Sequence, residues 1–371
     1  MLYLHIPFCS RKCSYCAFYS RVGGDVQAYV EALCREIELR AYEVWPKQHK
    51  VRTVYFGGGT PTLLSVNQLE RIVEQLNRSF NLSEIEECTI EANPECLTKQ
   101  YVADLRAMGF FNRVSVGVQS FADADLHTLN RRHSGEDAVR AVANLKERGY
   151  RNVSIDLIYG IPGQSAEQWQ ANLDTVASLD IQHLSCYALT VEHGTILDHQ
   201  TRSGRVRMPD EDEVLARYET LLEWCGSNGF TQYEISNFCR EPYRSRHNSH
   251  YWDHTPYMGF GAAAHSFDGS HRRWNISDTT QYINGIHNNN TYFEMEKISE
   301  IDAFNEYIMT ALRTTEGIDI SKLDPVFADG LKDNILKYIM EGYIYIQDGH
   351  YRPTEKGLLH ADGIAADLII A

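Results

Sequence analysis

The chain has 371 residues, of which 43% are hydrophobic and 23% charged, a composition typical of globular proteins. Its length predicts one large core with a smaller appended domain. The formal net charge of -15 repels phosphate backbones, so nucleic acid is not expected as a partner. The first residues lack the basic and apolar regions of a signal peptide, and no apolar run approaches the ~18 residues of a membrane-spanning helix. We therefore expect a cytoplasmic protein with reduced thiols and no stable membrane insertion.

Short runs rich in β-branched and aromatic residues predict six strands, at residues 2–6, 52–56, 87–91, 113–118, 152–158 and 182–188. Segments with helical spacing lie between them, including residues 27–44, 66–80 and 136–149. This alternation predicts an α/β fold with a parallel sheet, although periodicity does not decide whether the sheet closes. In either architecture ligands bind at the carboxyl ends of the strands.

The alternation weakens after residue 190. A helix over 210–229 and a short strand near 233–238 precede a polar, aromatic stretch that predicts a loop-rich extension. From residue 296, helices are followed by a hairpin with an Asp-Gly turn, an order that favours a winged-helix-like α+β module. Its 14 acidic against 7 basic residues disfavour DNA binding on electrostatic grounds and favour a packing or partner surface. The expected domains are therefore 1–190, 191–295 and 296–371.

Three cysteines follow the first predicted strand in a CxxxCxxC pattern: Cys9, Cys13 and Cys16. One loop can fold their thiolates around a single centre. A four-iron cluster with three protein ligands keeps one iron open, which is useful where an exogenous molecule must bind. The alternative is a closed Cys3His zinc site completed by His5.

Other polar groups are expected at the same edge of the sheet. The FGGGTPT turn after the second strand, residues 56–62, exposes backbone amides to a ligand without interference from side chains. Glu91, Gln119, Arg131 and Asp156 come at or near the ends of later strands, where polar side chains face the ligand side.

The cysteine pattern, with Tyr15 before the last cysteine, resembles the radical S-adenosylmethionine (SAM) superfamily. The resemblance implies a partial (β/α)6 barrel and a [4Fe-4S] cluster whose open iron binds SAM for reductive cleavage to a 5'-deoxyadenosyl radical. The phrases LYLHIPFC, IEANPE, VSVGVQSF, LNRRH and IDLIYGIPGQ further resemble the branch that contains oxygen-independent coproporphyrinogen dehydrogenases and HemW-type heme chaperones. By this resemblance the SAM pocket comprises Tyr3, Tyr15, Gly58, Gly59, Thr60, Glu91, Gln119, Arg131, Asp156 and Ala188.

Two features of the sequence separate the relatives within that branch. The dehydrogenases carry an amino-terminal extension and a further cysteine two positions after the third cluster ligand, whereas Tyr3 stands near the start here and Phe18 occupies that position. The chaperones carry an HNxxYW motif, present as His247, Asn248, Tyr251 and Trp252.

A neutral imidazole is a good axial ligand for heme iron, and Tyr251, Trp252 and Phe260 offer apolar surface to a macrocycle. His247 is the predicted ligand, with His250, His254 and His265 as rivals.

The function expected from the resemblance is binding of a cluster, SAM and heme and transfer of heme to apo-hemoproteins such as respiratory enzymes. Such delivery would allow transient membrane contact by a monomer or dimer. The alternatives are a coproporphyrinogen III dehydrogenase and a zinc-binding interaction protein.

Overall fold

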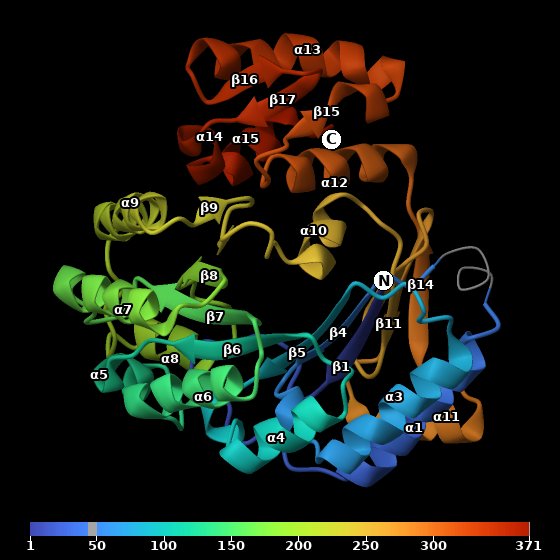
Figure 1. Cartoon of the computed structure of the whole chain (residues 1–371). Coiled ribbons are helices and arrows are strands. Elements are labelled where there is room, and N and C mark those ends of the chain that lie inside the picture. Colours follow the sequence, from blue (N-terminus) through green and yellow to red (C-terminus); the bar gives the residue numbers. More distant parts are fainter. Residues whose placement is uncertain (44–49, 371) are drawn as a thin grey trace.

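The computed structural model describes residues 1–43 and 50–370; Val44, the end of one predicted helix, and Ala371, the end of the predicted last domain, lie outside this range. The predicted parallel sheet is confirmed (Figure 1). Its six strands pair in chain order and in parallel: β1 (Leu2–Ile6), β4 (Thr53–Gly58), β5 (Glu87–Ala92), β6 (Arg113–Gln119), β7 (Asn152–Tyr159) and β8 (His183–Ala188).

Short strands extend this sheet at both edges. β11 (Met258–Phe260) pairs in parallel with β1, and β10 (Asn237–Cys239) and β9 (Thr231–Gln232) continue the sheet antiparallel beyond β8. The two edges do not pair with one another, so the described strands form an open, partial barrel. Sequence periodicity did not reveal β11, because three residues are too few to display an alternation.

Helices cover the outer face of the sheet. They are α1 (Val26–Arg40), α3 (Val66–Ser79), α4 (Lys99–Ala107), α6 (Gly135–Glu147) and α7 (Ala166–Leu179), with η1 (Pro61–Leu63), η2 (Pro94–Cys96) and α5 (Asp123–Thr128) in the connections. Side-chain oxygens cap the first turn of each long helix, as Ser65 does by accepting from the amide of Gln68. Gly149 follows α6 with φ +80°, the left-handed conformation that glycine adopts most readily.

The opposite, inner face of the sheet is polar. Tyr55 donates a hydrogen bond to Glu91, and the fully buried Arg113 lies among acidic and phenolic side chains from neighbouring strands. The short helix α10 (Arg246–Trp252) covers this face, where Figure 1 shows it between the sheet and the last domain. Because parallel strands alternate their side chains between faces, one face can pack on helices while the other presents polar groups.

The segment after β8 reaches both edges of the sheet (Figure 1). It contains α8 (Ile196–Arg202), α9 (Glu211–Ser227) and α11 (Thr279–Asn288), together with an antiparallel sheet of β12 (His265–Phe267), β13 (His271–Asn275) and β14 (Phe293–Lys297). β11 belongs to this segment yet joins the main sheet, so the extension and the barrel share a core.

A separate hydrophobic core holds the carboxyl-terminal part together. The order of elements is α12 (Glu300–Ala311), β15 (Ile318–Asp319), η3 (Ile320–Lys322), α13 (Pro325–Met340), β16 (Ile344–Gln347), β17 (His350–Pro353), α14 (Glu355–Leu359) and α15 (Ala361–Leu368). Asp348 and Gly349 turn the predicted hairpin with positive φ of 51° and 76°. Helices with a three-stranded antiparallel sheet confirm the predicted winged-helix-like domain. Among the described helices, none has the length and apolar character needed to cross a bilayer.

Candidate functional site

The cysteine loop leaves the sheet at the carboxyl end of β1. β2 (Phe8–Cys9) pairs with β3 (Arg21–Val22) and closes the loop at its base. Cys9, Cys13 and Cys16 are free, half-buried and close enough for their charges to interact. Thr60 Oγ1 lies 3.7 Å from Cys9 Sγ, and Arg131 Nη1 lies 3.3 Å from Cys13 Sγ. Both groups donate toward sulfur, as donors to a thiolate would.

This donor set fits an iron–sulfur cluster. In the described part of the chain, no three His, Cys, Asp or Glu side chains converge as ligands of one ion would. A cubane instead spreads three thiolates over three irons. His5 does not point a free nitrogen at the thiols, because Nδ1 lies 3.0 Å from the Tyr3 hydroxyl and Nε2 lies 2.9 Å from the Tyr19 carbonyl oxygen. A Cys3His zinc site would require one of these hydrogen bonds to break.

The glycine turn after β4 packs directly against the base of the cysteine loop. The Gly59 amide donates to the Ile6 carbonyl at 2.9 Å, and the Thr60 amide donates to the Phe8 carbonyl at 2.8 Å. A Cβ at Gly58, where φ is +109°, would lie 2.6 Å from the His5 ring, and one at Gly59 would lie 2.7 Å from the Phe8 carbonyl oxygen. Both positions therefore require glycine for this close approach.

Two carboxylates occupy the inner face near this turn. Glu91 accepts hydrogen bonds from the Tyr55 hydroxyl at 2.7 Å and from the Gly58 amide at 3.1 Å. Burial nevertheless raises the pKa of Glu91 to about 7. Asp156 accepts from Ser115 at 3.2 Å, and burial raises its pKa against the opposing effect of Ser185 and Arg113. These groups can hold a cationic or hydroxyl-bearing ligand near the turn.

Arg131 connects three strand ends to the cysteine loop. Its Nη2 donates to the Asn93 side-chain oxygen and to the Gly117 carbonyl, both at 2.6 Å, and Asn93 in turn donates to Thr60 Oγ1 at 3.0 Å. Burial by itself would lower the pKa of Arg131. The nearby Tyr15 and Cys13 side chains favour the charged guanidinium more strongly, so the net effect is a raised pKa. Asn93 was not predicted from the sequence, although its position directly after β5 is the signal that could have indicated it.

The remaining predicted SAM contacts lie around the same edge. Tyr15 packs with Leu129, Ile158 and Ile161, and Tyr3 stacks on Tyr55 at a centroid distance of 6.2 Å. Gln119 ends β6 with φ +68°, and Ala188 ends β8. The structure thus brings most of the predicted residues to the carboxyl ends of the strands and the loops beside them, whereas Tyr3 lies near the amino end of β1 and Asp156 in the middle of β7. Their contact with SAM stays a prediction.

His247 lies deep under the inner face, not on an exposed loop. It is fully buried, with Nδ1 2.8 Å from Thr53 Oγ1 and Nε2 3.2 Å from the Tyr251 hydroxyl. Burial lowers its pKa, so the ring is neutral, and its centroid lies 5.0 Å from that of Tyr55. Iron ligation by His247 stays a prediction, and it would require one of these hydrogen bonds to break.

A cavity of about 810 Å³ opens beside the cysteine loop. Its wall includes five aromatic residues and two imidazoles: Tyr3, Phe18, Tyr19, Tyr251, Tyr257, His5 and His265. Tyr3 and Tyr251 connect it to the predicted SAM pocket and to the HNxxYW motif. The volume lies within the range of small-molecule and cofactor sites.

Known proteins share this fold and its sequence features. The radical SAM superfamily profile matches residues 3–176, and the HemN C-terminal domain profile matches residues 298–360. The heme chaperone HemW of Lactococcus lactis is 33% identical over 96% of this chain and 93% of its own, and HemW of Mycobacterium tuberculosis is 35% identical over 90% and 88%. Coproporphyrinogen III oxidase (HemN) from Escherichia coli, described as a radical SAM enzyme, superposes with a TM-score of 0.82 at 25% identity, over 99% of this chain and 89% of its own.

The fold and the cysteine site therefore define a radical SAM protein, and this class implies a [4Fe-4S] cluster and SAM. The similarity is distributed along nearly the whole chain, through the barrel and into the last domain. The chain belongs to the HemW family.

Proposed function

We propose that the protein is a heme chaperone that binds heme in addition to a [4Fe-4S] cluster and SAM. It transfers the heme to apo-hemoproteins such as respiratory enzymes. The observation that carries this proposal is the identity of 33–35% to proteins named heme chaperones along almost the full chain. The aromatic cavity with imidazoles in its wall supports it, because a macrocycle needs flat apolar surface and its iron needs a neutral nitrogen ligand.

In this proposal Cys9, Cys13 and Cys16 hold the cluster, and SAM contacts the ten residues assigned above from the family resemblance. When bound and reduced, the cluster supplies the electron that cleaves SAM. The Arg131 guanidinium lies beside Cys13, where its positive charge would offset that of the thiolates. The hydrogen bond from the Gly58 amide holds the Glu91 carboxyl group beside the glycine turn, at the proposed cofactor edge.

The same proposal assigns three domains to the chain: a barrel over 1–190, an extension over 191–295 and an acidic last domain over 296–371 that serves as packing or partner surface. The protein acts in the cytoplasm as a monomer or dimer, with transient membrane contact during delivery.

A coproporphyrinogen III dehydrogenase is the second candidate, favoured by the likeness to HemN over 99% of this chain. Phe18 occupies the position at which the family resemblance implies a further cysteine in those enzymes. Phe18 is 73% exposed and lies beside the cysteine loop. The two candidates differ in the fate of the tetrapyrrole, which is carried unchanged in one case and oxidised in the other.

The test uses the full chain purified without oxygen. We expect iron and sulfide in cluster stoichiometry, a visible heme spectrum after hemin addition, and transfer of that heme to an added apo-hemoprotein. Replacing all three cluster cysteines by alanine provides the cluster-free control. Turnover of coproporphyrinogen III by the reduced protein with SAM would establish the dehydrogenase instead, and zinc without iron or sulfide would contradict both.

A further inference from the structure

The cavity beside the cysteine loop, the segment that carries Cys9, Cys13 and Cys16, has two walls from distant parts of the chain. One wall is the cysteine loop itself, with Phe18 and Tyr19, and the other comes from residues 251–277, with Tyr251 and Tyr257. Tyr251 and Tyr257 are packed edge to face at 4.9 Å, so this wall is a rigid aromatic surface. Both walls suit a flat, largely apolar molecule.

Among the histidines near this cavity, His265 differs in its surroundings. It is exposed into the cavity, and no polar partner lies within hydrogen-bond distance of its ring among the described residues. Its ring stacks on Trp274 at 6.3 Å with an interplanar angle of 26°. The cavity walls desolvate the ring and lower its pKa, and Arg272 lowers it further, so the imidazole is neutral at pH 7.

The rival histidines are engaged elsewhere. His5 and His247 each use both ring nitrogens in hydrogen bonds. His250 Nδ1 faces Asp253 at 3.3 Å, and His254 Nε2 bonds to Thr310 at 2.8 Å. Neither His250 nor His254 belongs to the cavity wall. His265 is therefore the imidazole that could reach a ligand without first losing a protein contact.

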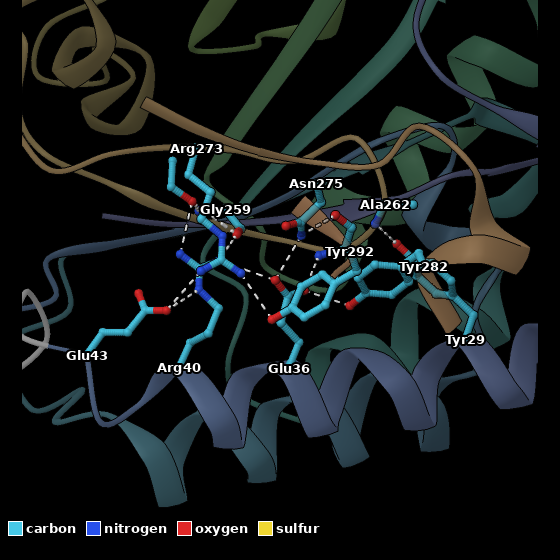
Figure 2. Close-up of polar contacts among 12 residues, drawn as sticks. Tyr29, Glu36, Arg40, Glu43, Gly259, Ala262, Arg273, Asn275, Tyr282 and Tyr292 are labelled. Atoms are coloured by element: carbon cyan, nitrogen blue, oxygen red, sulfur yellow. Dashed lines mark hydrogen bonds and ion pairs between the residues drawn. The ribbon is translucent and has the colours of Figure 1, made fainter. Parts of the chain in front are cut away.

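The segment before His265 is held in place by a buried network, shown in Figure 2. Glu36 on α1 accepts from the Gly261 amide at 2.8 Å and from the Tyr282 hydroxyl at 2.6 Å. Arg40 pairs with Glu36 and donates to Ser266 Oγ at 3.1 Å, next to His265. A ligand residue anchored in this way keeps its direction when an iron atom binds.

A charged group completes the cavity. Lys12 on the cysteine loop lies in the wall, and among the described residues it forms no ion pair. A tetrapyrrole with carboxylate side chains could place one of them at this ammonium while its ring lies between the aromatic walls. The cavity thus offers flat surface, one neutral nitrogen and one cation.

From these contacts we propose that heme binds in the cavity between the cysteine loop and residues 251–277, with His265 as the axial ligand of its iron. This assignment depends on the heme-binding function proposed above and gives His247 a different role. His247 is a positioning residue, because its Nε2 holds the hydroxyl of Tyr251, which forms part of the wall. The HNxxYW motif then shapes the heme site without supplying its iron ligand.

The experiment titrates hemin into the full, anaerobically purified chain and records the Soret band and the spin state of iron. We expect His265→Ala to change the axial-ligand spectrum and to weaken binding about tenfold or more, equivalent to ~1.4 kcal/mol or more. Added imidazole should restore the wild-type spectrum of this variant by entering the space left by the side chain. His287→Ala, on the exposed part of α11, is the matched control and should behave as wild type.

His247→Ala separates positioning from ligation. We expect weaker hemin binding with an unchanged axial-ligand spectrum, while far-UV circular dichroism verifies that the variant is folded. A wild-type spectrum and affinity in folded His265→Ala would overturn the assignment, as would loss of the ligand signature in folded His247→Ala. Failure of the wild-type chain to bind hemin at all would instead refute the proposed function itself.

Discussion

At the scale of single residues, Glu91 is held in an environment that opposes its charge. Burial raises its pKa from 4.5 to about 7, so the folded protein retains a proton that the unfolded chain has already released between these pH values. The unfolded state is then favoured progressively as pH rises from 4.5 to 7. At higher pH the full effect reaches at most roughly 3 kcal/mol.

Glu91→Gln should remove much of this pH dependence, because the amide cannot ionise. We expect the free energy of unfolding of the cluster-free variant to fall less than that of the wild type between pH 5 and pH 8. Chemical denaturation at both pH values measures this difference. Glu74→Gln, on the exposed side of α3, serves as control and should keep the wild-type slope. Equal slopes for Glu91→Gln and the wild type would contradict the expected ionisation of Glu91.

Candidate site residues could be predicted from the sequence where they lie at strand ends within a motif, and the structure places Glu91 and Gln119 at the ends of β5 and β6. The sequence did not reveal Tyr55 or Arg113, because a tyrosine within a strand and an arginine at its start have no pattern that distinguishes the inner from the outer face. Their contribution depends on neighbours from other strands: Tyr55 bonds to Glu91 on β5, and Arg113 lies close to Glu87 and Asp156.

At the scale of elements, the glycine turn and the cysteine loop form one unit. Gly59→Ala would place a methyl group 2.7 Å from the Phe8 carbonyl oxygen, and neither backbone can yield independently. Such overpacking typically costs ~1–3 kcal/mol, here at the base of the cysteine loop. We expect less iron and sulfide per chain than in the wild type after anaerobic reconstitution.

Gly226→Ala in α9 is the matched control, because a Cβ there meets no atom within 4 Å. It should retain a full cluster and be stabilised by up to roughly 1 kcal/mol through helix propensity. Full cluster content in Gly59→Ala would show that the turn and the loop are not coupled.

Long elements were predictable and short ones were not. α3 and α6 have apolar stripes and cap residues of their own, and the sequence placed both ends of each within one or two residues. α10 has only 7 residues, and the amides at its start are satisfied by Glu87, which is distant in sequence. Tertiary contacts of this kind stabilise α10 and β11, and they cannot be predicted from a local sequence pattern.

At the scale of the whole molecule, the described residues form two large hydrophobic cores, which are joined by polar contacts. The last domain has its own core, including Ile308 and Ile335, which is separate from that of the barrel. The two parts meet through backbone hydrogen bonds, such as Ile235 to Arg313 at 2.9 Å, and through the pair of Arg244 with Glu316. Polar interfaces of this kind couple two cores weakly.

The two cores should therefore unfold in separate steps. All five tryptophans precede residue 298, so tryptophan fluorescence reports only on the barrel and extension, whereas far-UV circular dichroism also reports on the helices of the last domain. Because the smaller domain buries a smaller share of its surface, we expect ellipticity to begin to fall at lower urea than fluorescence changes. Arg244→Ala removes the pair with Glu316 and should widen the gap between the two curves. Coincident curves for wild type and variant would show instead that the barrel and the last domain unfold as one cooperative unit.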